Sequence, residues 1–229
     1  MKTVVFDIET VGLPWLDLDP MLREALTRGA AGGEEYRTKK EWRSLSPYAS
    51  RVVVIAMQNP DSGQGKVWYE AEGERQESRS ADGLFERIGT TEAGMLAEFW
   101  ETLSRFDRVV SFNGRSFDGP FLSVRSAAHG VRPSKNLSGY RYSVGEHLDL
   151  LEILTFHGAV RAPMVPTLHA ACLTFGIPSP KSAEMHGHAV GEAYREGRLA
   201  EILDYCRRDV EATCALFRKL ETTLLPLFR

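Results

Sequence analysis

Four acidic residues lie in apolar surroundings in three separated segments, and they constrain the fold of this chain more than any other feature. Asp7 and Glu9 belong to VVFDIETVG, Asp118 to VVSFNGRSFDGPF, and Asp209 to YCRRDVEAT. A buried carboxylate is unfavourable unless it is paired or bound to a metal. The sequence offers no evident dedicated Lys or Arg partner for each of these acids. We therefore expect the fold to gather the four carboxylates around hard divalent cations.

The composition is compatible with a single α/β domain over residues 1–229, because the chain has 229 residues and is 43% hydrophobic. The net charge of −3 gives a polyanion no general attraction, but two bound divalent cations would place four positive charges at the site. Net charge therefore neither favours nor excludes a nucleic-acid substrate. An odd number of cysteines without a CxxC pair suits no disulfide framework (Cys172, Cys206 and Cys214). The N-terminus lacks the apolar region of a signal peptide, and no apolar run is as long as a membrane span. We expect a cytoplasmic enzyme.

The first third of the chain predicts three antiparallel strands. The β-branched run Lys2–Asp7 predicts a buried strand that ends at the first acids. Arg51–Gln58 and Lys66–Ala71 are two more β-rich runs, and the NPDSGQG between them predicts a hairpin. Residues 13–50 predict a surface insertion that contains a short helix around Met21–Arg28. The polar residues 72–91 predict a loop.

The rest of the chain predicts mainly helices. Apolar spacing predicts a helix over Thr91–Ser104, with Thr91 as its cap, and a strand follows at Arg108–Phe112. Further elements are predicted at Asp118–Ala128 (helix), His147–Leu154 (a strand or the start of a helix), Thr167–Phe175 (helix) and Leu199–Leu220 (a long amphipathic helix). This order predicts an α/β fold with a mixed sheet, antiparallel in its first three strands and then parallel, flanked by helices.

The spacing of the acids places them on shared faces. Asp7 and Glu9 are two residues apart, so on a strand they point the same way, while Phe6 and Ile8 point into a core. Tyr205 and Asp209 are four apart and share a helix face, where a tyrosine beside a metal-binding aspartate would orient a water.

The second segment is ambiguous when it is taken alone. Asp118 is then best explained as a helix N-cap, and Asn113 and Phe117 as a turn residue and a core residue. Only the combination with the other acids favours a shared site.

Jointly, DIETxG, NGxxFD and YCxxDVxxT resemble the DEDD exonucleases of the ribonuclease H-like superfamily. The tyrosine four residues before the last aspartate makes the chain similar to the tyrosine (DEDDy) subgroup. The histidine subgroup would need His five residues before that aspartate, where this chain has Asp204. The chain most resembles stand-alone predicted 3′-5′ exonucleases related to the exonuclease domain of family-B DNA polymerases. The segments SPYASRVVVIAM, HLDLLEIL and TFGIPSPK extend this resemblance over nearly the whole chain.

The resemblance implies a ribonuclease H-like fold and hydrolysis of single-stranded 3′ ends by a two-metal mechanism, with DNA favoured over RNA. It implies that four acids hold two Mg²⁺ or Mn²⁺ ions (Asp7, Glu9, Asp118 and Asp209). Tyr205 would position the attacking water, and Glu9 would help to orient it. Asn113 and Phe117 would contact the terminal nucleotide, and Thr10 would lie near the terminal 3′ hydroxyl. An RNA exonuclease and a non-catalytic nucleic-acid-binding protein of the same fold remain alternatives.

Several weaker features have both a functional and a structural interpretation. Lys181 could approach a phosphate, His147 is interpreted as structural, and Asp149 as a possible support for the metal ligands. Arg207 and Arg208 are interpreted as part of a solvated helix face. His186 and His188 could bind a metal or lie on a polar surface. A basic cluster with interleaved aromatic residues is either a track for the substrate strand or a charged insertion surface (Tyr36, Arg37, Lys39, Lys40, Trp42 and Arg43).

Overall fold

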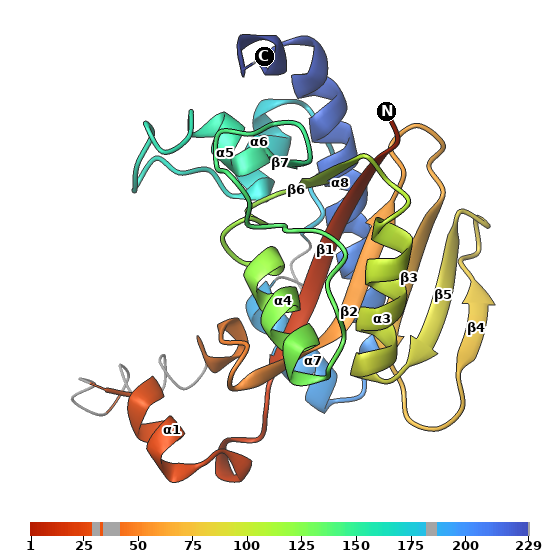
Figure 1. Ribbon diagram of the computed structural model, residues 1–229, viewed down its shortest axis with the longest axis vertical. Coiled ribbons are helices and arrows are strands. Elements are labelled where there is room, and N and C mark those ends of the chain that lie inside the picture. The colour runs from red at the N-terminus through yellow and green to blue at the C-terminus, as the bar shows by residue number, and fades with distance from the viewer. Residues whose placement is uncertain (29–32, 34–41, 182–186, 229) are drawn as a thin grey trace.

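The computed structural model describes residues 1–28, 33, 42–181 and 187–228, and their centre is a seven-stranded mixed sheet in the order β4-β5-β3-β2-β1-β6-β7 (Figure 1). The strands are β1 (Thr3–Gly12), β2 (Ser50–Gln58), β3 (Gly65–Glu70), β4 (Gln76–Arg79), β5 (Phe85–Thr90), β6 (Arg108–Ser111) and β7 (His147–Asp149). The helices are α1 (Pro20–Leu26), α3 (Glu92–Leu103), α4 (Asp118–Ala128), α5 (Leu150–Leu154), α6 (Leu168–Thr174), α7 (Val190–Arg195) and α8 (Leu199–Thr222). Short 3₁₀ turns lie at Trp15–Asp17, Trp42–Leu45 (η2), Gly187–Ala189 and Leu225–Phe228.

The pairing of the strands confirms the predicted mixed α/β sheet. β1, β2 and β3 form an antiparallel meander, while β6 and β7 run parallel to β1 on its other side. β5 runs parallel to β3, and β4 pairs antiparallel with β5 at the edge. The Thr91 hydroxyl caps α3 by accepting a hydrogen bond from the Gly94 amide, as the sequence predicted.

Helices cover both faces of the sheet, and alternate residues of β1 enter the two cores. Phe6 and Ile8 pack with the apolar residues of α3 and α4, whereas Val5 and Val11 pack on the side of α8. Since side chains alternate along a strand, Asp7 and Glu9 share the α8 side with Val5 and Val11. In Figure 1, α3 and α4 lie in front of the sheet and α8 passes behind it. Within the described ranges, no helix combines the length and the apolar character that crossing a bilayer requires.

Two predictions of local structure are wrong. β1 continues through Asp7 and Glu9 to Gly12, because β2 pairs with it along this whole length. Residues 72–91 contain β4 and β5 instead of a loop. The four residues of β4 are exposed and polar, so they lack the apolar alternation by which strands are recognised. Only backbone pairing with β5 identifies this strand.

Candidate metal centre

The acids of β1 lie where β1 has lost its parallel neighbour. β6 pairs with Thr3–Val5 only, while β2 stays paired on the other flank with a register shift between Glu9 and Thr10. Asp7 and Glu9 therefore stand beside an open flank of the strand and face α8. Glu9 is 8% exposed, so its carboxylate is largely withdrawn from water.

Asp118 is bound directly to β1. It is the first residue of α4 and is 4% exposed, and its Oδ1 accepts a hydrogen bond of 3.2 Å from the backbone amide of Ile8, which lies between the two acids of β1. The N-cap residue of α4 is Phe117, which makes no side-chain cap bond. The interpretation of Asp118 as a simple helix cap is thus wrong. Its carboxylate instead joins the acids of β1.

The turn before α4 requires a residue without a side chain. A Cβ atom on Gly114 would come within 2.3 Å of the Ser111 hydroxyl oxygen. The turn is closed by a hydrogen bond of 2.7 Å from the Gly119 amide to the Gly114 carbonyl. Asn113 has a φ of 67°, in the left-handed region that asparagine tolerates better than most residues. These features turn the chain from the end of β6 into α4 and bring Asp118 beside β1.

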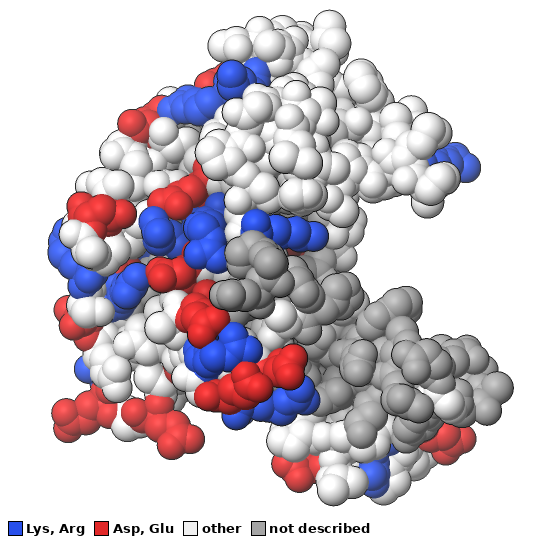
Figure 2. Space-filling view, turned by 180° about the vertical axis from the view of Figure 1, so that it is seen from behind, with Lys and Arg blue, Asp and Glu red and all other residues white. Residues whose placement is uncertain are grey.

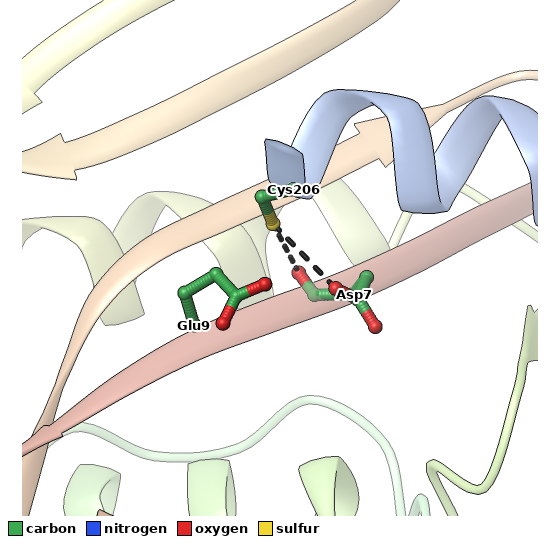
Figure 3. Close-up of side chains that lie close together, drawn as sticks. All are labelled: Asp7, Glu9 and Cys206. Carbon is green, nitrogen blue, oxygen red and sulfur yellow. Dashed lines mark hydrogen bonds between the residues drawn. The ribbon is translucent and has the colours of Figure 1, made fainter. Parts of the chain in front are cut away.

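α8 supplies the remaining residues of the site. Tyr205 and Asp209 are both buried, and each side chain influences the pKa of the other, as expected for a spacing of four residues on one helix face. Figure 3 shows Cys206 reaching from α8 toward Asp7 on β1, with Glu9 next along the strand. The Cys206 Sγ atom lies 3.7 Å from Asp7 Oδ2 and 3.6 Å from the Asp7 carbonyl oxygen.

The electrostatics of the cluster disfavour four charged carboxylates without a cation. Burial, followed by repulsion from the neighbouring acids, raises the pKa of Asp7 and of Glu9 well above the usual range. Burial also raises the pKa of Asp118 to about 7, and that of Asp209 to about 7 although Arg208 and Lys181 act in the opposite direction. Burial and the nearby Asp209 raise the pKa of Tyr205, so its phenol keeps its proton and can donate it in a hydrogen bond.

The donor atoms present fit a divalent cation. One ligand atom from each of Asp7, Glu9 and Cys206 can be chosen so that all lie within 4.8 Å of one another, while Asp118 and Asp209 raise the pKa of both acids through space. Carboxylate oxygens suit Mg²⁺ and Mn²⁺, whereas a thiol suits softer ions. Sequence reasoning overlooked Cys206 as a member of the site. Its signal was the helical spacing of three residues from Asp209.

Three of the predicted substrate residues have contacts that the structure describes. Thr10 is buried, and its hydroxyl donates to the Ser44 carbonyl at 2.7 Å. Phe117 packs on Phe121 at 5.5 Å between ring centroids. Lys181 is exposed, and its charge acts on Asp209.

Asp149 and His147 have structural contacts that connect β7 to the site. The Asp149 carboxylate accepts hydrogen bonds from the amides of Asn113 (2.8 Å), Arg115 (2.9 Å) and Leu151 (2.9 Å), so it supports the turn before α4 and caps α5. The His147 ring bonds the Ser111 hydroxyl at 2.8 Å and contacts the Leu137 carbonyl oxygen at 2.5 Å. This agrees with the structural interpretation of His147.

The other weak candidates have structural contacts or fall outside the described residues. Arg207 is half-buried, pairs with Glu211 at 2.7 Å and lies over the Phe85 ring, and the guanidinium of the half-buried Arg208 donates to the Pro180 carbonyl at 3.2 Å. Neither arginine is therefore fully solvated, contrary to the interpretation of a solvated helix face. The predictions for the basic cluster and the two loop histidines concern residues, or side chains, that the structure does not describe (Tyr36, Arg37, Lys39, Lys40, Trp42, Arg43, His186 and His188).

Comparisons with known proteins identify the class. The family described as predicted 3′-5′ exonucleases related to the exonuclease domain of PolB matches residues 47–224, and the chain belongs to this family. The matched range begins after Asp7 and Glu9, which the structure brings to Asp118 and Asp209. Exonuclease domains of this type use divalent metals, in agreement with the acidic donor set.

A solved family-B DNA polymerase, from the hyperthermophilic archaeon Pyrobaculum calidifontis, has a similar fold. The superposition has a TM-score of 0.61 and 22% sequence identity, and it covers 96% of this chain. The chain spans about a quarter (24%) of the length of that polymerase. This similarity supports the ribonuclease H-like fold. Among curated proteins, none matches the chain significantly.

Proposed function

We propose that the protein is a metal-dependent 3′-5′ exonuclease that removes nucleoside 5′-monophosphates from single-stranded DNA ends. The observation that carries this proposal is the meeting of four carboxylates from β1, α4 and α8, three of them buried and Asp7 half-buried, with their pKa values raised. Such a cluster is unfavourable by itself and becomes favourable when divalent cations bind. Family membership supports the exonuclease reaction.

In this proposal Asp7, Glu9, Asp118 and Asp209 hold two Mg²⁺ or Mn²⁺ ions. When bound, the ions would lower the pKa of a water and stabilise the charge that develops on the leaving 3′ oxygen. The water attacks the terminal phosphorus, the bond from phosphorus to the 3′ oxygen breaks, and the shortened strand keeps a 3′ hydroxyl.

Tyr205 and Glu9 orient the attacking water. The Tyr205 phenol stays protonated because burial and the neighbouring acids raise its pKa, so it holds the water by hydrogen bonding and does not act as a base. Glu9 lies on the side of β1 that faces α8, the helix of Tyr205, and it has little contact with solvent.

Four further residues contact the substrate in this proposal. Asn113 and Phe117 belong to the turn that leads into Asp118 and contact the terminal nucleotide. The Thr10 hydroxyl already donates to Ser44, so Thr10 contacts the 3′ end through its backbone. Lys181 lies close enough to influence Asp209 and approaches a phosphate.

A labelled-strand assay tests the reaction. Single-stranded DNA and RNA of equal sequence, each labelled at the 5′ end, are incubated with Mg²⁺, Mn²⁺ or EDTA. We expect a ladder that shortens from the 3′ end on DNA, is abolished by EDTA and is absent for Asp7→Ala. Faster shortening of RNA would identify RNA, and not DNA, as the preferred substrate. Internal cleavage would exclude an exonuclease. The absence of metal-dependent cleavage of either polymer would exclude the proposed reaction.

The role of Tyr205 is tested with a matched pair of tyrosine variants. Tyr205→Phe should lower the single-turnover rate about 10- to 100-fold while strand affinity changes little, because it removes only a water-orienting hydroxyl. Tyr194→Phe is the control, since Tyr194 is also partly buried but bonds to Glu70 and Arg51 away from the acids. Equal rates for Tyr205→Phe and wild type would show that the Tyr205 hydroxyl does not orient the water.

A further inference from the structure

A row of aromatic rings lies on the surface of the described chain near α5 and the C-terminal turn. Tyr140 contacts Tyr142 at 5.5 Å between ring centroids, and Tyr142 contacts His157 at 5.0 Å. His157 contacts Phe228 at 5.3 Å, and Phe228 contacts Phe156 at 5.7 Å. We call these five residues the aromatic row. Tyr140 is 74% exposed, Tyr142 56% and Phe156 47%, so three of its rings meet solvent instead of filling a core.

Two residues of the aromatic row have an unfavourable backbone conformation. Phe156 and His157 have φ values of 50° and 54°, in the left-handed region that bulky residues seldom adopt. Hydrogen bonds of 3.0 Å from the Phe156 amide to the Ile153 carbonyl and of 2.7 Å from the His157 amide to the Glu152 carbonyl hold them there. Strained residues of this kind cluster at ligand-binding sites.

Ion pairs around the buried Glu152 carboxylate connect the aromatic row to the turn that leads to Asp118. The Glu152 carboxylate contacts the guanidinium groups of Arg141 (3.1 Å) and Arg115 (3.0 Å), and Arg141 stands between the two tyrosines in the sequence. Arg115 lies in the turn that leads to Asp118, and it donates to the carbonyls of Gly139 (2.8 Å) and His147 (2.7 Å). The loop that carries the tyrosines is therefore tied to the turn that supplies a metal ligand.

The composition of this surface fits a single strand of nucleic acid. Aromatic faces stack with bases of any sequence, and arginine adds attraction for phosphate and for the rings. Arg141 and Arg161 are exposed here, and the Arg141 side chain is 51% exposed although it contacts Glu152. Figure 2 shows the outline of the molecule hollowed between the part that carries α5 and the part that carries α1.

We propose that the aromatic row is a stacking platform for nucleotides upstream of the 3′ end, so that the protein binds single strands better than very short oligonucleotides. This rests on the proposed function, since the row would act on the strand that the metal centre shortens. Tyr140 and Tyr142, the most exposed pair, would stack with the bases, and Arg141 would attract the phosphates beside them.

The test compares substrates of two lengths. In a Tyr140→Ala/Tyr142→Ala variant, affinity for a single strand of about ten nucleotides, measured by fluorescence anisotropy in EDTA, should fall at least about tenfold. The Mn²⁺-dependent rate on a dinucleotide should stay within about twofold of wild type, because a dinucleotide would not extend to the row. Tyr140→Phe/Tyr142→Phe should restore affinity, since phenylalanine still stacks.

The controls separate this proposal from its rivals. Leu173→Ala removes another exposed apolar side chain (63% exposed), on α6, and should change neither affinity nor rate. Unchanged affinity for the long strand would overturn the proposal, and so would an equal loss on both lengths. A change of oligomeric state with intact strand binding would make the row a protein interface instead. Binding is measured without metal, so it can succeed or fail independently of the nuclease reaction.

Discussion

Glu92 and Asp118 are both buried carboxylates at the first residue of a helix, but the chain treats them in opposite ways. Glu92 bonds to the Arg125 guanidinium at 2.6 and 2.9 Å, to the His129 ring at 2.8 Å and to the Val52 amide at 2.9 Å. Burial tends to raise the pKa of Glu92, but these bonds outweigh it and lower the pKa. Asp118 has only backbone amides as hydrogen-bond donors among these contacts, and burial, followed by the nearby acids, raises its pKa.

The presence or absence of an arginine partner distinguishes a structural buried acid from a candidate functional one. The chain does supply arginine to buried carboxylates, at Glu92 and again at Glu152. The lack of a comparable guanidinium bond at Asp118 among the described contacts is therefore a property of that site, and not of the protein as a whole. A cluster of acids with raised pKa values therefore indicates a site where a bound cation balances the negative charge.

The largest expected effect is on activity. Asp118→Asn keeps an oxygen for the Ile8 amide but removes one charge that binds the cations, so the single-turnover rate should fall about 1,000-fold. Glu92→Gln is the matched control and should keep the wild-type rate per folded molecule. The expected difference between the two acids would be contradicted if Asp118→Asn retained a tenth of the activity, or if the folded Glu92→Gln protein lost most of it.

The next effect is on stability, and its sign differs between the two acids. Glu92→Gln leaves the Arg125 guanidinium without its carboxylate and should lower the free energy of unfolding by about 3 kcal/mol. Asp118→Asn removes a repelled charge and should raise it in the metal-free protein at pH 8 by about 1 kcal/mol. Urea denaturation in EDTA measures both. The comparison would be lost if the two substitutions changed stability in the same direction.

The smallest effect is the pH dependence of the metal-free protein. Asp118 and Asp209 have pKa values of about 7 in the folded chain against a usual 3.8, so the folded state binds more protons between these values. Stability should therefore fall as the pH rises from 5 to 8. Denaturation in EDTA across this range measures the slope, which Mn²⁺ should reverse. A flat profile would show that burial does not raise the pKa values of these two acids as described.

Glu92 should give the opposite slope in a different window. Its pKa is lowered, so its stabilising contribution is present above its ordinary pKa of 4.5 and is lost as the pH falls through its folded pKa. Comparing Glu92→Gln with wild type below pH 5 isolates this contribution and sharpens the contrast with Asp118.

Local patterns allowed much of the fold and the site to be predicted. Runs of β-branched and apolar residues identified β1, β2 and β3, and a spacing of four residues correctly put Tyr205 and Asp209 on one face of α8. The polar edge strand β4 could not be recognised, because backbone pairing forms it. Contacts between residues that are distant in the sequence could not be predicted either. The bond from the Ile8 amide to Asp118 and the Arg115–Glu152 pair depend on how β6, β7 and α4 pack together.

The pairing of β1 with β2 has a practical consequence for engineering. Gly12 lies opposite Ser50 in the ladder, and the Leu13 amide donates to the Ala49 carbonyl at 2.9 Å, so the chain leaves the sheet and returns to it at adjacent positions. All four acids lie outside residues 13–49. A segment closed at its base in this way can be exchanged for that of a relative while the anchoring pair is retained. Such chimaeras would vary the surface around the candidate site while the four acids stay in place.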